Sequence, residues 1–429
     1  MQFSSQDRTS NGPYNLQDIA IIGPGTTTAS RANFGIFMNR GVHNLTMQRI
    51  LVKGAGSIGV YFGDSADPNE TAGLLRDISF KYGQIYDNVE QGALGGVLYQ
   101  KLIGNSIDNN GYFSTCGNGC HNIYLSNELN PTTSRSGYGY QIIGNTITGN
   151  SKTNGTSCTA TSAVFHGSVF GILIQGNAMM ETSTTYGGGC YGFIVNSGYT
   201  TVEGFRSVVF RDNTIVNMPI PIGGNALPYV LIENNNIEFN VSGGDFYGIT
   251  LPVQNSSSLT TGDLADTNAT IRNNTFNVTA GNINTALINF GEFNLNAGSN
   301  IKVFNNLGFI GSAVNATHSC FVLGDRTIAS NFTGFDYNLC YHQGGNGRWS
   351  RASDTTSYAN LAAAQAANAD VHGFATDPLF SVTRSAANFY SCAIQSGSPA
   401  KNTGSTANGS PLAFGGVTFT GTRSIGACQ

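Results

Sequence analysis

The chain has 429 residues, of which 40% are hydrophobic and only 10% are charged, and its formal net charge is -4. Frequent apolar residues exclude an intrinsically disordered chain, and 20 Lys and Arg against 24 Asp and Glu leave no basic surface for a nucleic-acid partner. No apolar run approaches the ~18 residues needed to cross a bilayer, so we expect no membrane insertion.

The N-terminal part of the chain carries two features. The start at Met1 lacks the charged and apolar regions of a signal peptide, so an exported protein would have lost that segment. No capping segment is visible there, as expected of a start inside a larger protein. Residues 64–70 form an acidic loop that could ligate Ca²⁺, but the loop lacks the spacing of an EF-hand, and a solvated turn is the alternative.

One short sequence motif, which we call the asparagine phrase, recurs along the chain. It consists of apolar residues, a polar pair that ends in Asn, one polar residue and one apolar residue. Residues 143–147 (Ile-Gly-Asn-Thr-Ile) are one copy. Its asparagines lie 22 to 40 residues apart, a spacing that suits three-strand coils with loops of variable length. Asparagine tolerates the left-handed conformation, so it can turn the chain sharply, and stacked amides can form a hydrogen-bonded ladder. These asparagines are Asn105, Asn145, Asn177, Asn213, Asn235, Asn274, Asn306 and Asn338.

The asparagine phrase divides each coil into a strand before it, a strand after it and a third strand that opens the next coil. Stacked coils of this kind form parallel sheets. The irregular spacing excludes leucine-rich repeats, which need a Leu-rich phrase at constant spacing, and the alternating strands contain no helix-length segments. We therefore predict an all-β fold, a right-handed parallel β-helix of about ten coils over residues 1–345. Third strands are expected at 122–126, 163–166, 193–196, 248–253, 286–290 and 320–323.

The third strands carry one candidate catalytic group. His166 ends a third strand one coil after Tyr124, with His121 nearby. A β-eliminating lyase needs a base, a cation that neutralises the uronate carboxylate and an acid for the leaving oxygen. A histidine such as His166 or a tyrosine could be the base, Arg135 the cation and Tyr124 the acid. Strand alternation leaves the direction of His166 open, and a hydrogen-bonded histidine in the core is the alternative.

The loops on either side of the third strands are candidates for substrate binding. On one side, three long loops contain four cysteines and Tyr186, and Cys158–Cys190 is the favoured cross-loop disulfide. The other side contains charged and aromatic residues, which could bind the faces and hydroxyls of sugar rings. A loop edge without a function is the alternative. The predicted substrate-binding residues are Glu128, Arg135, Tyr138 and Tyr186.

A pair of carboxylates provides a second candidate catalytic group. Residues 288–292 align with residues 321–325, which places Glu292 and Asp325 at the same position of adjacent coils, with backbones about 5 Å apart. Two carboxylates so close cannot both ionise easily, so one could act as the general acid of a glycoside hydrolase. Alternatively, Arg326 could neutralise the pair, the pair could hold Ca²⁺, or the match between the two positions could be incidental.

Residues 346–429 are predicted to form the closing coils and the cap of the stack. Residues 360–369 (Asn-Leu-Ala-Ala-Ala-Gln-Ala-Ala-Asn-Ala) have the propensity of one short helix. Such a helix could pack across a coil or cover the last coil, whose open end would otherwise expose a sheet edge.

The eight cysteines occur as neighbouring couples along the chain. An even count in such couples predicts disulfides formed in an oxidising compartment, and buried free thiols are the alternative. There are no Cys-x-x-Cys pairs and no clustered histidines, so we expect no zinc site. The cysteines are Cys116, Cys120, Cys158, Cys190, Cys320, Cys340, Cys392 and Cys428.

The repeated phrases and their asparagine turns resemble the pectate-lyase-like right-handed β-helix superfamily over roughly residues 15–345. The phrases at 336–338, 377–380, 396–400 and 423–427 resemble the closing coils of extracellular bacterial β-helix proteins. The resemblance implies the fold and an action on polysaccharide, but the superfamily includes lyases, hydrolases, epimerases, tailspikes and adhesins. The Gly-His-Gly phrase of polygalacturonases and the Asp-Pro-His-Glu phrase of alginate epimerases are absent from the sequence.

Together these features predict a secreted or cell-surface protein that acts on a polysaccharide, as a glycoside hydrolase or a lyase. A non-catalytic glycan-binding adhesin or structural protein is one alternative, and a phage tailspike depolymerase is another. We expect a monomer or a homotrimer. No cofactor is expected to be required, with Ca²⁺ left open, and no other metal is expected.

Overall fold

The computed structural model forms two compact units, which are described separately: residues 1–208 with 260–263, and residues 209–259 with 264–429. The residues that the structure describes are 1–3, 13–23, 34–38, 42–64, 76–96, 99–111, 120–127, 139–150, 152–153, 157–183, 185–186, 189–196, 204–225, 227–241, 244–251, 267–279, 284–290, 300–311, 318–324, 326–345, 347–352, 357–381, 392–418 and 421–428.

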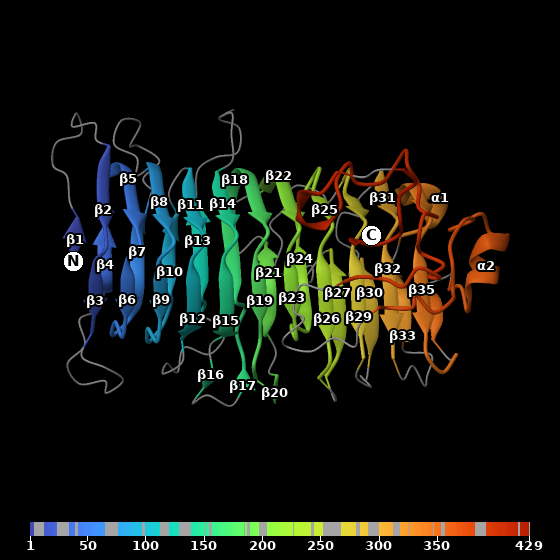
Figure 1. Cartoon of the computed structure of the whole chain (residues 1–429), viewed down its shortest axis with the longest axis horizontal. Helices are drawn as coiled ribbons and strands as arrows, with labels where there is room; N and C mark the ends of the chain where they lie inside the picture. The colour runs from blue at the N-terminus through green and yellow to red at the C-terminus, as the bar shows by residue number, and fades with distance from the viewer. Residues whose placement is uncertain are drawn as a thin grey trace. The chain divides into compact units, whose positions relative to one another are not determined.

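The first unit, which we call unit 1, consists of stacked coils that each add one strand to three parallel sheets (Figure 1). Sheet A contains β1 (Gln2–Phe3), β4 (Phe34–Met38), β7 (Ile58–Asp64), β10 (Ala93–Gly96), β13 (Ile123–Asn127), the first part of β18 (Ala163–Gln175) and β21 (Tyr191–Val195). Sheet B contains β2 (Tyr14–Gln17), β5 (His43–Gln48), β8 (Arg76–Lys81), β11 (Gln100–Ile103), β14 (Tyr140–Ile143) and the second part of β18. Sheet C contains β3 (Ala20–Ile22), β6 (Leu51–Lys53), β9 (Gln84–Tyr86), β12 (Ser106–Asn110), β15 (Thr146–Asn150) and β19 (Ala178–Met180). A small separate sheet contains β16 (Lys152–Thr153), β17 (Ser157–Cys158) and β20 (Thr185–Tyr186).

The second unit, unit 2, has the same three-sheet construction, and the boundary between the units falls within β22 (Gly204–Arg211). Sheet A contains β24 (Ile220–Gly224), β27 (Phe246–Thr250), β30 (Thr285–Asn289), β33 (His318–Gly324) and β36 (Arg348–Ala352). Sheet B contains the end of β22, β25 (Leu231–Glu233), β28 (Thr270–Arg272), β31 (Ile301–Phe304) and β34 (Phe332–Asp336). Sheet C contains β23 (Thr214–Val216), β26 (Asn236–Phe239), β29 (Thr275–Val278), β32 (Leu307–Ile310) and β35 (Leu339–His342).

The predicted all-β parallel β-helix is confirmed. Within the described residues, sheet C has six strands in unit 1 and five in unit 2, in agreement with about ten coils. The predicted helix is α2 (Leu361–Ala366), shorter than expected, and Asn360 caps it by accepting a hydrogen bond from the backbone of Ala363. A one-turn helix, α1 (Ile328–Asn331), and a 3₁₀ turn at Phe414–Gly416 were not expected. No helix within the described ranges is long and apolar enough to cross a membrane.

The inside of the coils is filled by apolar side chains in register. In sheet C of unit 1, pairing aligns Ile85 with Ile107, Ile107 with Ile147 and Ile147 with Met179, and all four are fully buried. Alternate residues of a strand point to opposite faces, so one face of each sheet forms this core and the other is available for function.

The predicted asparagine ladder is confirmed in both units, because each amide Nδ2 donates to the Oδ1 of the next asparagine at 2.9–3.0 Å. The left-handed residue, however, is the one before the ladder asparagine, which corrects our assignment of the turn by one position. Ladder asparagines use both amide ends, whereas the preceding residue needs only to tolerate a positive φ. In unit 1 the ladder is Asn105, Asn145 and Asn177, and in unit 2 it is Asn213, Asn235, Asn274, Asn306 and Asn338.

A second, unpredicted asparagine ladder occupies another turn of unit 1. Asn88 donates to Asn110 at 2.8 Å, Asn110 donates to Asn122 at 3.0 Å, and Asn122 donates to Ser162 at 3.2 Å. All four side chains are buried. This ladder fixes the chain immediately before β13 and β18, the strands that carry the candidate site.

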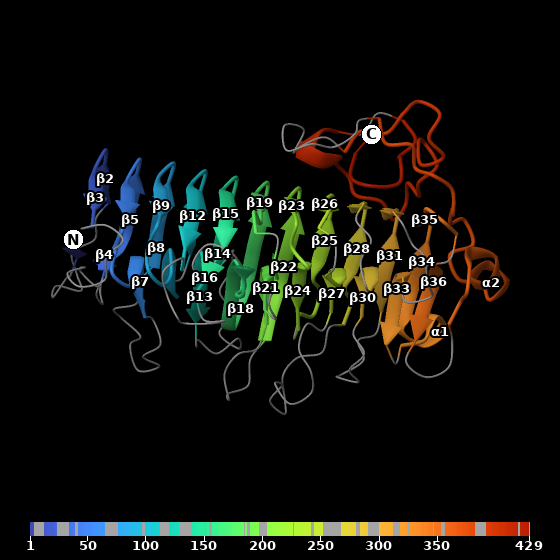
Figure 2. The ribbon, with the colours of Figure 1, turned by 90° about the horizontal axis from the view of Figure 1, so that it is seen from below.

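The C-terminal tail of unit 2 returns along the turns of its own coils, beside sheet C (Figure 2). Ala400 and Ile425 pack with Leu307 and Leu339 of sheet C. The side chain of Asn305 bonds to the backbone of Ser405 in both directions, at 2.8 and 3.0 Å. The tail therefore covers coils already formed. The proposed domain boundary after residue 345 stays a prediction.

Candidate functional site on the outer face of sheet A

Sheet A of unit 1 carries a row of outward-facing apolar and aromatic side chains. Strand pairing aligns Phe37 with Tyr61, Tyr61 with Leu94, and Leu94 with Tyr124. All four side chains are partly exposed, whereas neighbours such as Leu125 are fully buried in the core. Because pairing places one residue per coil, the row runs along the stack, with about 4.8 Å between coils.

Tyr124 lies between two histidine rings on this face. Its ring centroid is 5.3 Å from that of His121, with nearly parallel planes, and 5.3 Å from that of His166, with an edge-on arrangement. The sequence left the direction of His166 open, and the structure places it on the outer face with Tyr124. The predicted grouping of His166, Tyr124 and His121 therefore exists in space, although His121 is almost completely buried.

Hydrogen bonds to the following coil fix the tautomer of both histidines. Nδ1 of His121 lies 2.6 Å from the carbonyl oxygen of Thr161, and Nδ1 of His166 lies 2.7 Å from that of Asn196. A carbonyl can only accept, so Nδ1 carries the proton and Nε2 carries the lone pair in the neutral ring. Burial lowers the pKa of His121 to about 4, and burial also lowers the pKa of His166. Both rings are therefore neutral at neutral pH.

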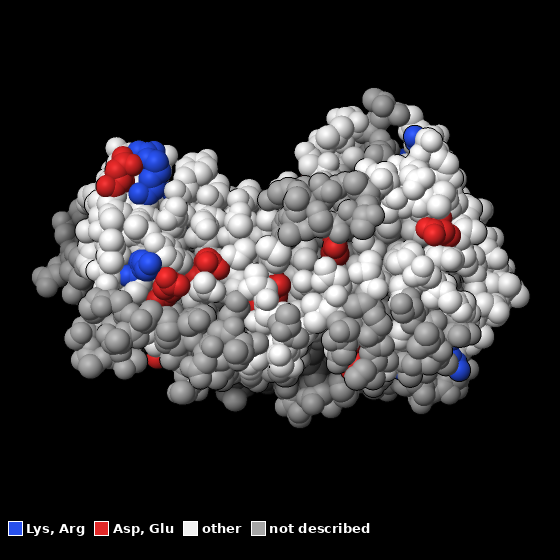
Figure 3. Space-filling model, turned by 60° about the horizontal axis from the view of Figure 1, so that its bottom comes forward, with Lys and Arg blue, Asp and Glu red and all other residues white. Residues whose placement is uncertain are grey.

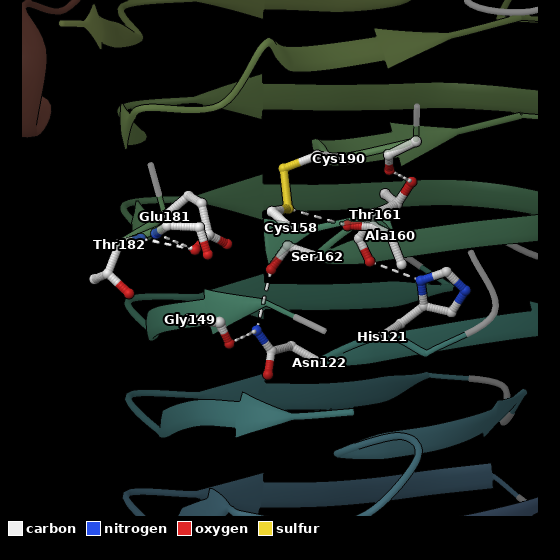
Figure 4. The surroundings of a disulfide bond; sticks show 12 residues. His121, Asn122, Gly149, Cys158, Ala160, Thr161, Ser162, Glu181, Thr182 and Cys190 are labelled. Carbon is white, nitrogen blue, oxygen red and sulfur yellow. Dashed lines mark hydrogen bonds between the residues drawn. A yellow bond between two sulfur atoms is a disulfide. The ribbon is translucent and has the colours of Figure 1, made fainter. Parts of the chain in front are cut away.

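The partner carbonyl of His121 is held in place by the neighbouring loop (Figure 4). The hydroxyl of Thr161 donates to the carbonyl of Gly189 at 3.2 Å, and the adjacent disulfide Cys158–Cys190 joins the two loops with 5.3 Å between Cα atoms. The predicted Cys158–Cys190 bond is thus confirmed. It fixes the segment that orients His121, so this disulfide supports the candidate site.

Glu181 lies beside the same disulfide and was not predicted. Its side chain is buried and accepts hydrogen bonds from the backbone of Thr182 at 2.8 Å and of Ser183 at 2.7 Å. Tyr186, predicted to bind substrate, lies on β20 in register with Cys158. Burial raises the pKa of the Tyr186 phenol, and the negative charge of Glu181 raises it further, so this phenol stays protonated.

Three aromatic rings at the N-terminal end of the row form a second group that sequence reasoning missed. The ring centroids of Phe37 and Tyr61 are 5.2 Å apart with stacked planes, and Phe34 lies 5.0 Å from Phe37 and 5.5 Å from Tyr61. The asparagine phrase begins only at Asn105, so these earlier strands lacked a marker. The sequence signal that could have located this group is the presence of aromatic residues in the two short strands β4 and β7.

The predicted carboxylate pair, Glu292 and Asp325, lies outside the described residues. The strands before it do show the predicted alignment, because Ile288 pairs with Phe321 in β30 and β33. The guanidinium of Arg326 is buried and donates to the carbonyl of Phe290 at 2.5 Å, with its centre 5.5 Å from the Phe290 ring. The acidic loop 65–70 and the predicted residues Glu128, Arg135 and Tyr138 also lie outside the described residues.

Two groups of side chains in the described part of the chain have a composition that could suit a metal ion. In both groups the two cysteines form a disulfide, so neither offers a thiolate ligand. The disulfide Cys392–Cys428 lies in the tail, and Cys120 is also disulfide-bonded. The groups are Cys158, Glu181 and Cys190, and Cys320, Cys340 and His342.

Charge is sparse on the face shown in Figure 3, where described Lys, Arg, Asp and Glu side chains are scattered. The strands of sheet A in unit 1 show aromatic, aliphatic, hydroxyl and imidazole groups wherever their side chains are described. The outer face therefore combines flat apolar rings with a few fixed hydrogen-bonding groups. No protein-family model, curated protein or solved structure matches this chain.

Proposed function

We propose that this chain is an extracellular polysaccharide-cleaving protein, and that its glycan lies along the outer face of sheet A in unit 1. The observation that carries the proposal is the row in which Phe37, Tyr61, Leu94 and Tyr124 face outward at successive coils, with His166 against Tyr124. Binding sites for small ligands combine apolar and aromatic walls with a few placed polar groups. Sugar rings have apolar CH faces and hydroxyl edges, so they match such a row.

The proposed chemistry is β-elimination at a uronate. In this step a neutral imidazole Nε2 takes the proton alpha to the carboxylate, a carbon–carbon double bond forms, the bond to the leaving oxygen breaks, and the Tyr124 phenol gives that oxygen a proton. His166 is the proposed base, because it is less buried than His121 and its Nδ1–H is held by Asn196. The cation that this mechanism needs is assigned to Arg135.

The family and location form part of the same proposal. Stacked parallel coils with an internal asparagine ladder support membership of the pectate-lyase-like superfamily. The disulfides support an oxidising, extracellular location, because such bonds persist outside the reducing cytosol. The register of β30 with β33 favours one second candidate, a glycoside hydrolase that uses Glu292 and Asp325.

A panel of uronic and neutral polysaccharides tests the proposal, with ultraviolet absorbance reporting unsaturated products and a reducing-end assay reporting all cleavage. We expect unsaturated products from one uronic polymer, and a loss of about 10²-fold or more in His166→Gln. Tyr124→Ala should weaken binding, whereas Tyr82→Ala should not, because Tyr82 is an exposed tyrosine at a turn after sheet B.

The outcomes separate the candidate functions. Reducing ends without absorbance, lost in Glu292→Gln or Asp325→Asn and kept in His166→Gln, would replace the lyase with the hydrolase. Binding without cleavage would leave a glycan-binding adhesin, and an absence of binding across the panel would overturn the proposal.

A further inference from the structure

Sheet B of unit 2 carries a row of charged residues in consecutive coils. Pairing aligns Arg211 of β22 with Glu233 of β25, and Glu233 with Arg272 of β28. The Glu233 carboxylate is 1% exposed, and each of its oxygens accepts one bond, from Nε of Arg211 at 2.6 Å and from Nε of Arg272 at 2.8 Å. One buried carboxylate thus lies between two guanidinium groups.

Arg211 and Arg272 both have N–H groups that do not donate to Glu233. The two Nη groups of Arg211 make no hydrogen bond to any described residue, and Arg272 uses one Nη group in a 3.4 Å bond to the carbonyl of Asn408. The side chains are 28% and 20% exposed, so a solute from water can reach them. Guanidinium groups present planar pairs of N–H donors that match the oxygens of an oxyanion.

The C-terminal tail brings a third guanidinium to the same place. Arg423 interacts electrostatically with both Arg272 and Glu233, and burial and the charge of Arg272 lower its pKa while Glu233 raises it. The Arg423 guanidinium lies beside Gly409, since a Cβ at that position would lie 2.8 Å from an Nη of Arg423, and Gly409 follows Asn408, whose carbonyl accepts from Arg272. Residues 396–428 contain Lys401 and Arg423 and no acidic residue.

Positive charge is in excess at this cluster. Three arginines surround Glu233, and counting Asp212, which follows Arg211 in the chain, still leaves three positive charges against two negative ones. Lys302 lies one coil beyond β28 on the same sheet and is exposed, which adds to the positive potential. Asp336, farther along the sheet, is held by His372 at 2.7 Å. Partly buried charges of one sign repel strongly unless an anion balances them.

We propose that Arg211, Arg272 and Arg423, arranged around Glu233 under the C-terminal tail, form a binding site for an oxyanion: a sulfate, a phosphate or a carboxylate. The anion accepts hydrogen bonds from the Nη groups of Arg211 and Arg272, and Arg423 adds positive charge beside them. The site lies in unit 2 and does not depend on the proposed glycan-binding face of unit 1. Its ligand is either a free inorganic anion or the acidic group of a larger molecule.

Calorimetric titration of the full chain with sodium sulfate tests the site. We expect saturable binding, weakened about tenfold or more in Arg211→Gln, because the change removes charge-assisted hydrogen bonds to the anion. The matched control is Arg49→Gln, which removes a guanidinium from an exposed ion pair with Asp18 in unit 1 and should leave the affinity unchanged. Sulfate also stabilises folded proteins without binding, so a thermal shift alone is insufficient.

A second variant gives a prediction of opposite sign. Glu233→Gln removes the negative charge that competes with the ligand, so in a folded protein it should tighten sulfate binding. Equal or weaker binding in that variant, or equal affinity in Arg211→Gln and Arg49→Gln, would overturn the proposal, as would no saturable binding by the wild type. If inorganic phosphate competes with sulfate and monomeric uronate does not, the ligand is a free inorganic anion. If monomeric uronate competes and inorganic phosphate does not, the ligand is an acidic sugar.

Discussion

At the scale of single residues, the position of an amide in the coil decides its role. A ladder asparagine uses Oδ1 to accept and Nδ2 to donate in adjacent coils, so no apolar residue of similar size can replace it. The residue before it adopts the left-handed conformation and points away from the ladder. In unit 2 this preceding position is also asparagine at 234, 273 and 305, and these three side chains bind the tail.

Asn274→Ala should lower the stability of unit 2. The change removes the acceptor of the Asn235 backbone N–H at 3.1 Å and the donor to the Ile232 carbonyl at 3.0 Å, both in a buried site. Each buried group left unsatisfied costs about 1–3 kcal/mol. Urea unfolding should show this loss, while Asn240→Ala, at an exposed position, should stay within about 0.5 kcal/mol of wild type. Equal stability of the two variants would contradict the role of the ladder.

Asp370→Asn should stabilise the protein at neutral pH. Asp370 ends the unit 2 ladder by accepting from the backbone and side chain of Asn338, and burial raises its pKa well above the usual value, with Asp336 adding to the effect. A raised pKa means that stability is lost as pH rises from about 4 through the folded-state pKa. Asparagine stays neutral and can continue the ladder.

Thermal unfolding of wild type and Asp370→Asn across this pH range measures the difference. The advantage of the variant should grow with rising pH and shrink toward pH 4. A variant that is less stable than wild type at neutral pH would show that the carboxylate itself is needed.

At the scale of elements, the C-terminal tail is the part of unit 2 whose path depends on side chains far away in sequence. Asn273 donates to the carbonyls of Ser424 at 3.3 Å and Gly426 at 3.1 Å, and accepts from the backbone of Ser410 at 2.8 Å. One turn residue thus holds two segments of the tail, and the disulfide Cys392–Cys428 closes the tail into a loop.

Asn273→Gly should loosen the tail and leave the sheets intact. Asn273 has a φ of 53°, which glycine adopts without cost, so the change removes only the side chain. Amide exchange should accelerate in residues 400–428 and stay slow in β28 and β31. Asn217→Gly is the matched control, since Asn217 also has a positive φ, of 58°, and its side chain accepts from Asn240. Unchanged exchange in the tail would show that its apolar contacts suffice.

At the scale of the whole molecule, few charges and several buried neutral histidines set the response to acid. Burial lowers the pKa of His121 and of His342 to about 4, and lowers that of His166. The unfolded chain binds these protons near pH 6.5, so the histidine contribution to stability is present above that pH and is lost as pH falls toward 4.

The free energy of unfolding should therefore decrease as pH falls from about 6.5 to 4, by up to about 1.4 kcal/mol per pH unit for each such histidine. Denaturant unfolding at several pH values measures this slope. His121→Gln, which can still donate to Thr161, should reduce the slope. An equal slope in wild type and His121→Gln would assign the acid sensitivity to other groups.

Part of the fold and part of the candidate site could be predicted from the sequence. The asparagines from Asn105 to Asn338 mark the coils. Their ladder could be predicted because each stacked amide can donate a hydrogen bond to the asparagine of one adjacent coil and accept one from the other. The second ladder could not be predicted in the same way, since Asn88, Asn110 and Asn122 are separated by 22 and 12 residues and share no phrase. Cys158–Cys190 was predictable because the two long loops follow equivalent strands. The aromatic group at Phe37 and Tyr61 was not predictable without a coil marker.

The sequence by itself determined the parallel coils, the asparagine ladder, the short helix and the cross-loop disulfide, because each depends on local chemistry repeated at matching positions. Only the tertiary structure decided the outward direction of His166, the tautomers that Thr161 and Asn196 impose on the two histidines, and the return of the tail that brings Arg423 to Glu233. These features depend on contacts between residues in different coils or far apart in the chain, so a local sequence pattern cannot predict them.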